Sequence, residues 1–462
     1  METFDVTVIG AGPGGYPAAI RAAQLGAKVA LIEREQFGGT CLNWGCIPTK
    51  TLIAGSSLLH SIGHAESFGI KINGATADYA AMISRKNKVV EKLRTGISML
   101  LKTNGVTVFS GNASFEQRNV IRIDGKKTER IRTTGTVIAT GAESAMPKFL
   151  PRHERVVESR SFLDIDKLPD SMVVLGGGVI GCEFACMAAQ LGVKVTVVEM
   201  LEDILMPLDR DVRRELRRAM EKNLGIKVMT GHALQDITAG KDGVSGTVDG
   251  KTVSGDMLLV AVGRVPVTAN LNLAAAGLKT DERGFIPVDA MQRTAAPGIF
   301  AVGDVTGGIQ LAHAATAQGV AAAEIIMGAG RGAATLVPSC IFTAPEIGAV
   351  GLTEQEAQAA GITVKTGMFP FAALGKAMAI DEAGGFVKWI ADNATGRLLG
   401  AQAIGPHATE LIAEATLAVQ GEWTVEELGK TIHSHPTLSE AWMEAAHAAA
   451  GHCVHLPPVR KR

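Results

Sequence analysis

The chain has 462 residues, of which 47% are hydrophobic and 20% charged, and its formal net charge is −1. This length exceeds one ordinary hydrophobic core and favours about three domains, and the near-zero charge argues against partners such as nucleic acid or anionic lipid. There is no apolar stretch of about 18 residues and no N-terminal secretory pattern, so we expect neither membrane insertion nor export. Six cysteines are too few for a disulfide scaffold, and we expect a cytoplasmic protein.

The N-terminal residues predict a strand over 4–9, a glycine-rich turn, a helix and a second strand that ends at Glu33. The turn contains Gly10-x-Gly12-x-x-Gly15. In such a turn the first glycine makes the bend, the second lets the backbone approach a pyrophosphate, and the third lets helix pack on strand. The acid at the end of the second strand binds ribose hydroxyls. The segment is therefore predicted to bind a dinucleotide.

Residues 38–50, GGTCLNWGCIPTK, place Cys41 and Cys46 five positions apart. On an ideal α-helix their Cα atoms would be about 8.6 Å apart, beyond the ~7 Å limit for a disulfide. A bond between them requires a distorted helix, which the nearby glycines permit, and it would be easily reduced. No neighbouring residues complete a metal site. Two separate buried thiols also fit the spacing alone, and Trp44 between them has no firm explanation.

The first pattern repeats after a strand at 172–175. The interval from first glycine to acid is 23 residues in both copies, and the second copy contains Gly176, Gly178, Gly181 and Glu199. The sequence therefore predicts two dinucleotide sites. No Lys or Arg follows Glu199 until Arg210, so a 2′-phosphate would find a negative charge and no nearby cation, which favours NAD over NADP.

A third strand, over 298–304, ends in Asp304, whose carboxylate can accept hydrogen bonds from a sugar alcohol. A helix from about Leu311 would direct its positive end to the same ligand. Because this piece follows the second dinucleotide unit, we expect a discontinuous first domain with the second inserted in it. Beyond residue 337 the pattern changes to alternating strands followed by helices, with strands predicted at 348–352, 385–390 and 399–404.

Near the C-terminus, the segment HSHPTLSE contains His435 and Glu440. Histidine is the usual proton shuttle near neutral pH, and a carboxylate can fix its tautomer. Their spacing needs a turn or helix start after Pro436, and a structural or surface histidine is the alternative. His433 is given no role. Of the other cysteines, Cys182 and Cys186 are predicted on an apolar helix face, Cys340 in a strand, and Cys453 as an exposed thiol.

The motifs together resemble, over essentially the full length, the flavin-dependent pyridine nucleotide–disulfide oxidoreductases. The motifs are GAGPGGYPAA, GGTCLNWGCIPTK, ATG, GGGVIGCEFA, VVEM, AVGR, GIFAVGD and HSHPTLSE. The resemblance implies an α/β fold with two Rossmann-like dinucleotide-binding domains, for FAD and NAD, and a C-terminal α+β dimerisation domain. The implied divisions are 1–148 (FAD, first part), 149–267 (NAD), 268–336 (FAD, second part) and 337–462 (dimerisation).

The resemblance also implies roles for individual residues. Cys46 would contact the flavin and Cys41 would exchange with the substrate. His435, held by Glu440, would be the base, supplied across a dimer interface, and Lys50 would pair with Glu183 near the flavin. The residues implied to bind FAD are Gly10, Gly12, Gly15, Glu33, Thr40, Lys50, Ala113, Thr140, Gly141, Asp304 and Ala312. Those implied to bind NAD are Gly176, Gly178, Gly181, Glu199 and Gly263. No metal is implied.

The implied activity is oxidation of dihydrolipoyl groups of 2-oxoacid dehydrogenase-type complexes, through a Cys41–Cys46 disulfide and one non-covalent FAD per subunit, with reduction of NAD. The partners would be a second copy and a lipoyl-bearing acyltransferase or carrier protein. Two alternatives remain: another flavin-dependent disulfide or small-molecule reductase that uses NADPH, and a flavoprotein with a mainly structural role in a complex. Glutathione reductase would be expected to have a bulkier residue at Val179, and mercuric reductase a C-terminal cysteine pair, whereas the tail has only Cys453.

Overall fold

The computed structural model describes residues 1–330 and 332–457, and its first unit is built on a seven-stranded sheet. The order is β3-β2-β1-β6-β5-β4, with β17 also paired to β6. β1 runs parallel to β2 and to β6, and its last four residues are buried because neighbours cover it on both sides. The strands are β1 (Glu2–Ile9), β2 (Val29–Glu33), β3 (Thr107–Ser110), β4 (Asn112–Gln117), β5 (Val120–Asp124), β6 (Thr128–Ile138) and β17 (Ile299–Ala301).

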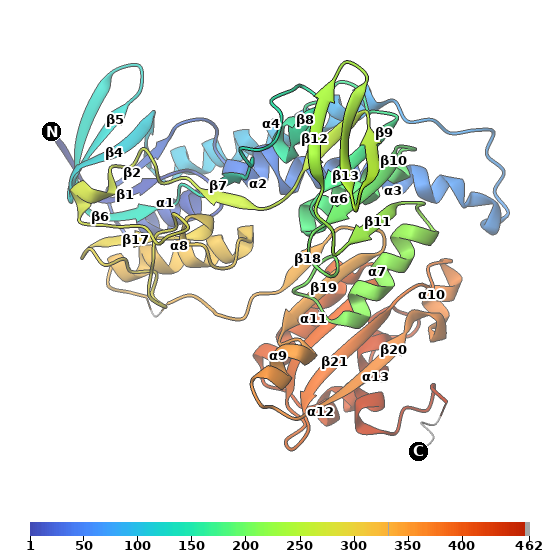
Figure 1. The fold of residues 1–462 in the computed structure, drawn as a ribbon. Helices are drawn as coiled ribbons and strands as arrows, with labels where there is room; N and C mark the ends of the chain where they lie inside the picture. Colours follow the sequence, from blue (N-terminus) through green and yellow to red (C-terminus); the bar gives the residue numbers. More distant parts are fainter. Residues whose placement is uncertain (331, 458–462) are drawn as a thin grey trace.

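Two helices from distant parts of the chain complete this unit. α1 (Gly15–Gln24) and α8 (Ala312–Ile326) pack against each other, and Figure 1 shows α8 and β17 beside the N-terminal elements. The hydroxyl of Thr316 donates to the carbonyl of Pro13 at 2.9 Å, and Arg21 pairs with Glu324 at 2.8 Å. The first unit is thus formed from two separated stretches of chain.

The second unit lies between these stretches in sequence and has a five-stranded parallel sheet in the order β11-β10-β9-β15-β8. A separate antiparallel sheet joins β12, β13 and β14, and β7 pairs with β16 where the chain crosses between units. The elements are β7 (Ala142–Ser144), β8 (Val156–Glu158), α5 (Ser159–Phe162), β9 (Ser171–Leu175), α6 (Val179–Gln190), β10 (Lys194–Glu199), α7 (Arg210–Lys222), β11 (Lys227–Thr230), β12 (Gln235–Gly240), β13 (Gly243–Val248), β14 (Lys251–Gly255), β15 (Met257–Val260) and β16 (Arg264–Pro266).

The C-terminal unit is an antiparallel sheet in the order β18-β19-β22-β21-β20, against which α11 and α13 pack. Trp389 on β21 donates its indole N–H to the carbonyl of Trp442 on α13 at 2.9 Å, within the core of this unit. The elements are β18 (Ser339–Ile341), β19 (Glu346–Gly351), α9 (Glu354–Ala359), β20 (Val364–Pro370), α10 (Gly375–Ala379), β21 (Phe386–Asp392), β22 (Leu398–Gly405), α11 (Ala408–Gln420), α12 (Val425–Lys430) and α13 (Glu440–Ala450). The predicted fold class is confirmed: two α/β dinucleotide-type units and an α+β unit.

Three helices that follow β2 link the first two units. α2 (Gly39–Trp44) and α3 (Cys46–Gly63) are separated by one residue, and a short 3₁₀ turn precedes α4 (Tyr79–Thr103). α3 packs on α4 and on α6, and its Leu52 belongs to the same apolar cluster as Phe184 of α6. The start of α3 is therefore held where the first and second units meet.

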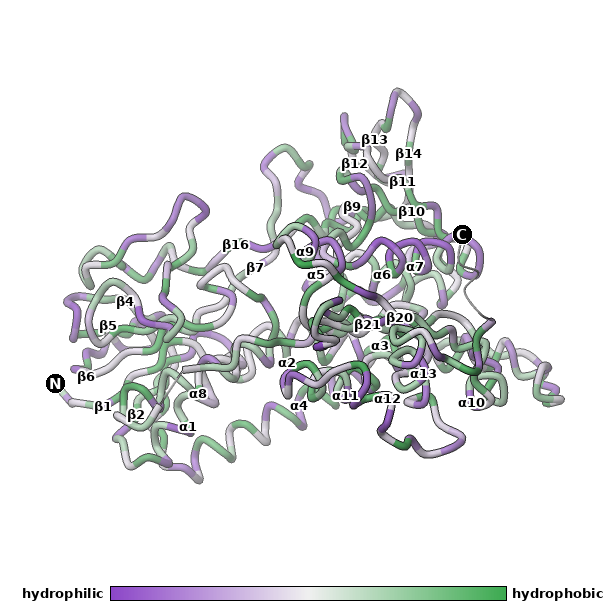
Figure 2. Tube along the Cα trace, turned by 90° about the horizontal axis from the view of Figure 1, so that it is seen from below, coloured by the Kyte–Doolittle hydropathy of each residue, from purple (hydrophilic) through white to green (hydrophobic). Residues whose placement is uncertain are grey.

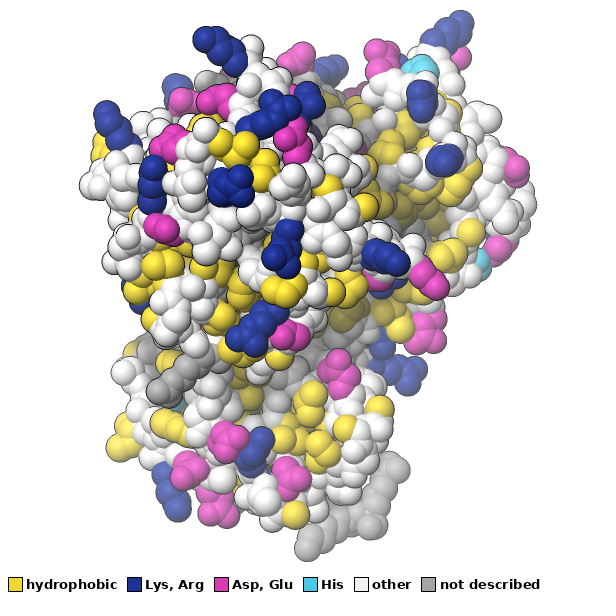
Figure 3. Space-filling model, turned by 90° about the vertical axis from the view of Figure 1, so that its left-hand side faces the viewer, with side chains coloured by type: hydrophobic (Ala, Val, Ile, Leu, Met, Phe, Trp, Pro, Cys, Tyr) yellow, Lys and Arg dark blue, Asp and Glu magenta, His cyan; other side chains and the backbone are white. Residues whose placement is uncertain are grey.

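Hydropathy follows the architecture (Figure 2), because the strands are mostly green and the tips of hairpins and loops are mostly purple. On the face shown in Figure 3, basic and acidic side chains are interspersed, and neither sign forms a continuous patch. Within the described residues, no helix combines the length and the apolar composition needed to cross a membrane.

The sequence located most of the buried strands but placed some boundaries wrongly. Residues 136–141, TVIATG, have the apolar pattern of a buried strand meeting a turn, but the strand there is the end of a longer one, β6, which begins at Thr128. The first part of β6 alternates between exposed and buried residues, because there it pairs with the antiparallel β5 and one face meets solvent. The strand ends at Ile138, before Gly141 turns the chain with a φ of +70°.

Candidate active site

The two cysteines of the GGTCLNWGCIPTK segment lie on either side of a helix break. Cys41 is in α2 and Cys46 is the first residue of α3. Gly45 between the helices has φ −142° and ψ −111°, so the chain leaves helical geometry at that residue. Both thiols are free, and a hydrogen bond between them is the largest influence on the pKa of each. The expected distortion of the helix is therefore confirmed, and the two sulfur atoms are neighbours.

The two thiols are electrostatically unequal. The hydrogen bond from Cys41 lowers the pKa of Cys46 to about 7; burial opposes this change, and the charge of Lys50 adds to it. The pKa of Cys41 is raised well above its ordinary value, first by that same hydrogen bond and then by burial and by the neighbouring thiolate. Cys46 is therefore the thiol of the pair that ionises near neutral pH, while Cys41 stays protonated.

A buried carboxylate, Glu183, joins the three units beside these thiols. Its side chain is only 5% exposed, and its two oxygens accept hydrogen bonds from the ammonium of Lys50 at 2.7 and 2.8 Å. One of these oxygens also accepts the backbone N–H of Phe342 at 2.9 Å. Lys50 belongs to α3, Glu183 to α6, and Phe342 follows β18, so the ammonium is fixed by contacts that depend on all three units.

A cavity of about 830 Å³ extends from the thiols toward the end of β2. It is lined by nearly all of the residues predicted to bind FAD and by the cysteine pair: Gly10, Gly12, Glu33, Thr40, Cys41, Cys46, Lys50, Ala113, Thr140, Gly141, Glu183, Asp304 and Ala312. Most of these residues come from the ends of β1, β2, β6 and β17 and from the helices that follow, whereas Ala113 lies in β4 and Glu183 in α6. The cavity thus lies at the carboxyl ends of parallel strands, where α/β sheets bind their ligands.

Gly15 is the one predicted FAD residue that is absent from the cavity wall. A Cβ atom there would lie 1.8 Å from the carbonyl oxygen of Gly10, and a Cβ on Gly181 would lie 2.0 Å from that of Gly176. In both copies the third glycine therefore allows the helix to pack closely against the turn before it. This is the packing role that the motif predicts.

The acids of the two copies also correspond. Glu33 accepts the N–H groups of Ala11 at 2.7 Å and Glu35 at 2.8 Å. Glu199 accepts those of Gly177 at 2.6 Å and Leu201 at 2.7 Å. Each carboxylate thus ties the glycine turn to the strand end. The predicted NAD residues, which are Gly176, Gly178, Gly181, Glu199 and Gly263, gather at the carboxyl ends of β9, β10 and β15, outside the cavity that contains the thiols.

His435 and Glu440 are brought together, but not to the thiols of the same chain. The Nδ1 atom of His435 lies 2.8 Å from a Glu440 oxygen, whose partner oxygen accepts the N–H of Thr437 at 2.8 Å. The imidazole is 76% exposed and is not part of the cavity wall. His433, which was given no role, pairs with Glu414 at 2.5 Å, and this hydrogen bond raises its pKa. Cys453 is not a fully exposed thiol, because it donates to Glu444 at 3.1 Å.

The sequence missed some residues of the cavity wall. Arg264, in the AVGR motif, contacts the carbonyl of Ala142 and lies 3.4 Å from Asp304, whose pKa is raised by burial. Arg160 stacks on Trp44 with 3.7 Å between the guanidinium carbon and the ring centroid. The AVGR motif gave a signal for Arg264, whereas no local pattern pointed to Arg160.

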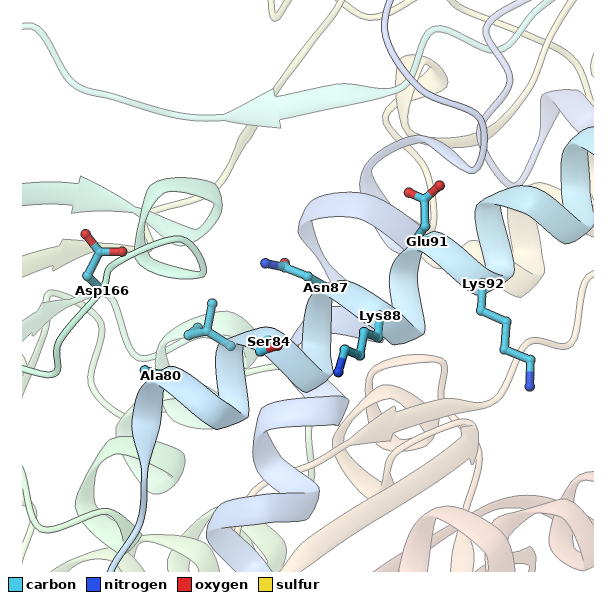
Figure 4. A pocket seen from close by; sticks show the side chains of 8 residues that line it. Ala80, Ser84, Asn87, Lys88, Glu91, Lys92 and Asp166 are labelled. Atoms are coloured by element: carbon cyan, nitrogen blue, oxygen red, sulfur yellow. The ribbon is translucent and has the colours of Figure 1, made fainter.

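A second hollow of about 800 Å³ lies along α4 and is lined mainly by polar side chains. Figure 4 shows Glu91 and the lysines Lys88 and Lys92 on opposite sides of the helix, with Asp166 across the hollow. None of the predicted site residues lines it. No group of three or more His, Cys, Asp or Glu within the described chain is arranged to hold a metal ion.

Comparison with known proteins identifies the family. Residues 4–319 match the family model described as pyridine nucleotide-disulphide oxidoreductase, and residues 337–446 match its dimerisation domain, which indicates a homodimer. Dihydrolipoyl dehydrogenase from Chlamydia muridarum is 44% identical over all of both chains, and that from Halobacterium salinarum is 45% identical over 98% of this chain and 97% of the relative.

Two solved structures have the same fold. LpdA from Mycobacterium tuberculosis matches with a TM-score of 0.90 and 30% identity, over 97% of this chain and 99% of that one. The HOCl-induced flavoprotein disulfide reductase RclA from Escherichia coli, as a Cu(II) complex, matches with a TM-score of 0.88 and 30% identity, over 96% and 99%. With two adjacent thiols, paired glycine–acid turns and these full-length similarities, the chain belongs to the pyridine nucleotide-disulphide oxidoreductase family, whose members use FAD and a pyridine nucleotide.

Proposed function

We propose that this protein is a dihydrolipoyl dehydrogenase that transfers electrons from a dihydrolipoyl dithiol to NAD. The observation that supports this most strongly is the cysteine pair at the wall of the dinucleotide cavity, with Cys46 poised as a thiolate and Cys41 as a thiol. The full-length relatives with 40–45% identity are dihydrolipoyl dehydrogenases.

The residues that line the cavity fit FAD. Gly10 turns with a φ of +97°, and a Cβ at Gly12 or Gly141 would meet little or nothing, so the backbone is open to a ligand at these positions. Glu33 lies at the end of β2, where a ribose would be bound. We propose that the cavity residues named above hold one non-covalent FAD per subunit. When bound, FAD would accept two electrons from the dithiol and pass them to the nicotinamide.

The difference in pKa between the two thiols assigns each of them a role in the reaction. A substrate thiolate attacks Cys41 of the Cys41–Cys46 disulfide, a substrate–Cys41 bond forms, and Cys46 leaves as a thiolate. The second substrate thiolate then attacks the sulfur of the bound substrate, closes the lipoyl disulfide and releases Cys41. The low pKa of Cys46 makes it the better leaving group. Lys50, fixed by Glu183, holds positive charge beside Cys46.

We propose that His435 takes the protons of the substrate thiols at the cysteine pair of a second copy, with Glu440 fixing its ring. Two observations support this: the imidazole is highly exposed, and it belongs to the unit that matches the dimerisation domain. Exposure leaves the ring accessible to a partner subunit, while the hydrogen bond at 2.8 Å fixes its Nδ1 atom and leaves Nε2 for proton transfer.

We further propose NAD as the nicotinamide cofactor, because Glu199 at the end of β10 would repel a 2′-phosphate. The proposed domains are 1–148, 149–267, 268–336 and 337–462, of which residues 331 and 458–462 lie outside the described structure. A lipoyl-bearing acyltransferase or carrier protein in the cytoplasm is the proposed partner, because it would present the dithiol.

The test compares oxidation of dihydrolipoamide with NAD and reduction of glutathione disulfide with NADPH. We expect the first reaction to be fast and the second to be negligible. Cys46→Ser should abolish turnover, and His435→Gln should slow it by ~10²–10⁴-fold while FAD stays bound. Faster reduction of glutathione disulfide with NADPH would instead identify a different disulfide reductase of the same family.

A further inference from the structure

One arginine connects the second unit to the segment between the two cysteines. Arg160 belongs to α5, which follows β8 at the edge of the second sheet. Its guanidinium carbon lies 3.7 Å from the ring centroid of Trp44, and its Nη2 atom donates to Glu35 at 3.0 Å. Glu35 follows β2 of the first unit. The guanidinium thus stacks on one residue of the first unit and forms an ion pair with another.

Trp44 occupies a position where its placement matters for the thiols. It is the last residue of α2, and only Gly45 separates it from Cys46. On its other side, Asn43 accepts hydrogen bonds from Arg94 of α4 at 3.0 and 3.2 Å. The end of α2 is therefore held from two directions at the point where the chain leaves helical geometry. Gly45, which separates the two helices, has more backbone freedom than any other residue type would have there.

The contact of Arg160 with Trp44 affects the position of the two thiols and does not stabilise the charge of the Cys46 thiolate. Lys50 is the cation that lowers the pKa of Cys46, whereas the charge of Arg160 is paired with Glu35. A planar guanidinium can stack on an aromatic ring and bind a carboxylate edge-on at the same time, which lysine cannot do.

We propose that Arg160 is a positioning residue for the redox pair: by stacking on Trp44 and pairing with Glu35, it fixes the end of α2 and so keeps the Cys41 and Cys46 sulfur atoms within reach of each other. This inference depends on the proposed function of the pair. Formation of the disulfide from the Cys46 thiolate and the Cys41 thiol joins the two sulfur atoms and breaks the Cys41 S–H bond; one proton is released, and two electrons pass to oxidised dithiothreitol, whose disulfide is reduced. Holding the two sulfur atoms close together shifts the equilibrium from the dithiol toward the disulfide, because less conformational freedom is lost when the bond forms.

The test is a redox titration of the FAD-loaded protein in mixtures of oxidised and reduced dithiothreitol. The oxidised fraction at Cys41 and Cys46 is measured by thiol alkylation and mass spectrometry, and FAD content by absorbance. In Arg160→Gln we expect the equilibrium constant for disulfide formation to fall by about three- to tenfold. A tenfold fall makes the potential about 30 mV less negative. Trp44→Phe retains a ring and should stay within about twofold of wild type, while Arg160→Lys should lie between Gln and wild type.

Two controls separate positioning from other effects. Arg130→Gln removes another arginine–glutamate pair, on the hairpin side of the first sheet, and should leave the equilibrium unchanged. In a Trp44→Val background, Arg160→Gln should have no further effect, because the surface on which it stacks is gone. The apparent pKa of Cys46 should remain near 7 in Arg160→Gln.

The outcomes distinguish this inference from the proposed function. If wild-type Cys41 and Cys46 never reach a dithiol–disulfide equilibrium, the proposed function fails. If wild type titrates and Arg160→Gln titrates identically with its FAD retained, only the positioning role is refuted. An equal shift in the Trp44→Val background, or a changed pKa of Cys46, would also refute it, because the effect would not pass through Trp44.

Discussion

Replacing Cys41 with alanine should raise the pKa of Cys46 strongly. The Cys41 hydrogen bond is the largest influence that takes this pKa from 9.0 to about 7; burial opposes it, and Lys50 contributes less. At about 1.4 kcal/mol per pKa unit, the difference is worth about 3 kcal/mol in favour of the thiolate. Without the donor, burial opposes the charge of Lys50, and we expect the pKa to rise toward the ordinary value of 9.0. The thiolate fraction at pH 7 should then fall from about half toward about 1%, the fraction at a pKa of 9.0.

The assay is the rate of Cys46 alkylation by iodoacetamide as a function of pH, in the reduced, FAD-loaded protein, with Cys46→Ser as the blank. Cys41→Ser is the matched control, because its hydroxyl is still a donor of similar size. We expect its Cys46 pKa to lie closer to that of wild type than to that of Cys41→Ala. If Cys41→Ala titrated at the wild-type pKa, the charge of Lys50 alone would explain the thiolate, and the reasoning from the hydrogen bond would be refuted.

Three further predictions concern packing and charge away from the thiols. The Lys388 side chain is 2% exposed, and its ammonium contacts three carboxylates at 2.7 to 3.2 Å. Lys388→Met should therefore lower the free energy of unfolding, measured in urea, by about 3–5 kcal/mol. An equal loss in Arg397→Gln, which removes a surface ion pair, would contradict this. Gly15→Ala would place a Cβ atom 1.8 Å from the carbonyl oxygen of Gly10, so α1 could no longer pack against the turn. The variant should therefore retain less FAD on gel filtration than wild type, and full retention would refute this packing role. The raised pKa of His433 means that its ion pair stabilises the fold fully below about pH 6.5 and less as pH rises through the raised value. His433→Gln should therefore lose more stability at about pH 6 than at about pH 9, and a pH-independent loss would exclude the ion pair as the cause.

The glycine–acid turns show how far local sequence can predict this site. Gly10 and Gly176 both have positive φ, at +97° and +111°, and Glu33 and Glu199 bond the same turn positions. These features depend on residues within one βαβ unit, where strand period, turn chemistry and helix packing act over short distances. The same holds for the helix break at Gly45, because a bond between Cys41 and Cys46 requires a distorted helix.

The pair of His435 and Glu440 was also predictable, because five residues and a turn after Pro436 bring them together. Its separation from the thiols of the same chain was implied by the family resemblance, in which the base is supplied across a dimer interface, and not by the spacing of the motif. That separation follows from the placement of the C-terminal unit, which sequence spacing does not describe.

The sequence by itself determined the two dinucleotide turns, their acids, the cysteine pair and the histidine–glutamate pair, because each depends on contacts between residues near one another in the chain. The pair of Lys50 and Glu183, 133 residues apart, was implied by the family resemblance and not by any local pattern, and only the tertiary structure decided that Glu183 also meets Phe342, 159 residues away. It alone placed Arg160 on Trp44. Such contacts follow from how α3, α5, α6 and β18 pack together, and packing between distant elements leaves no periodic pattern in the sequence of any one of them.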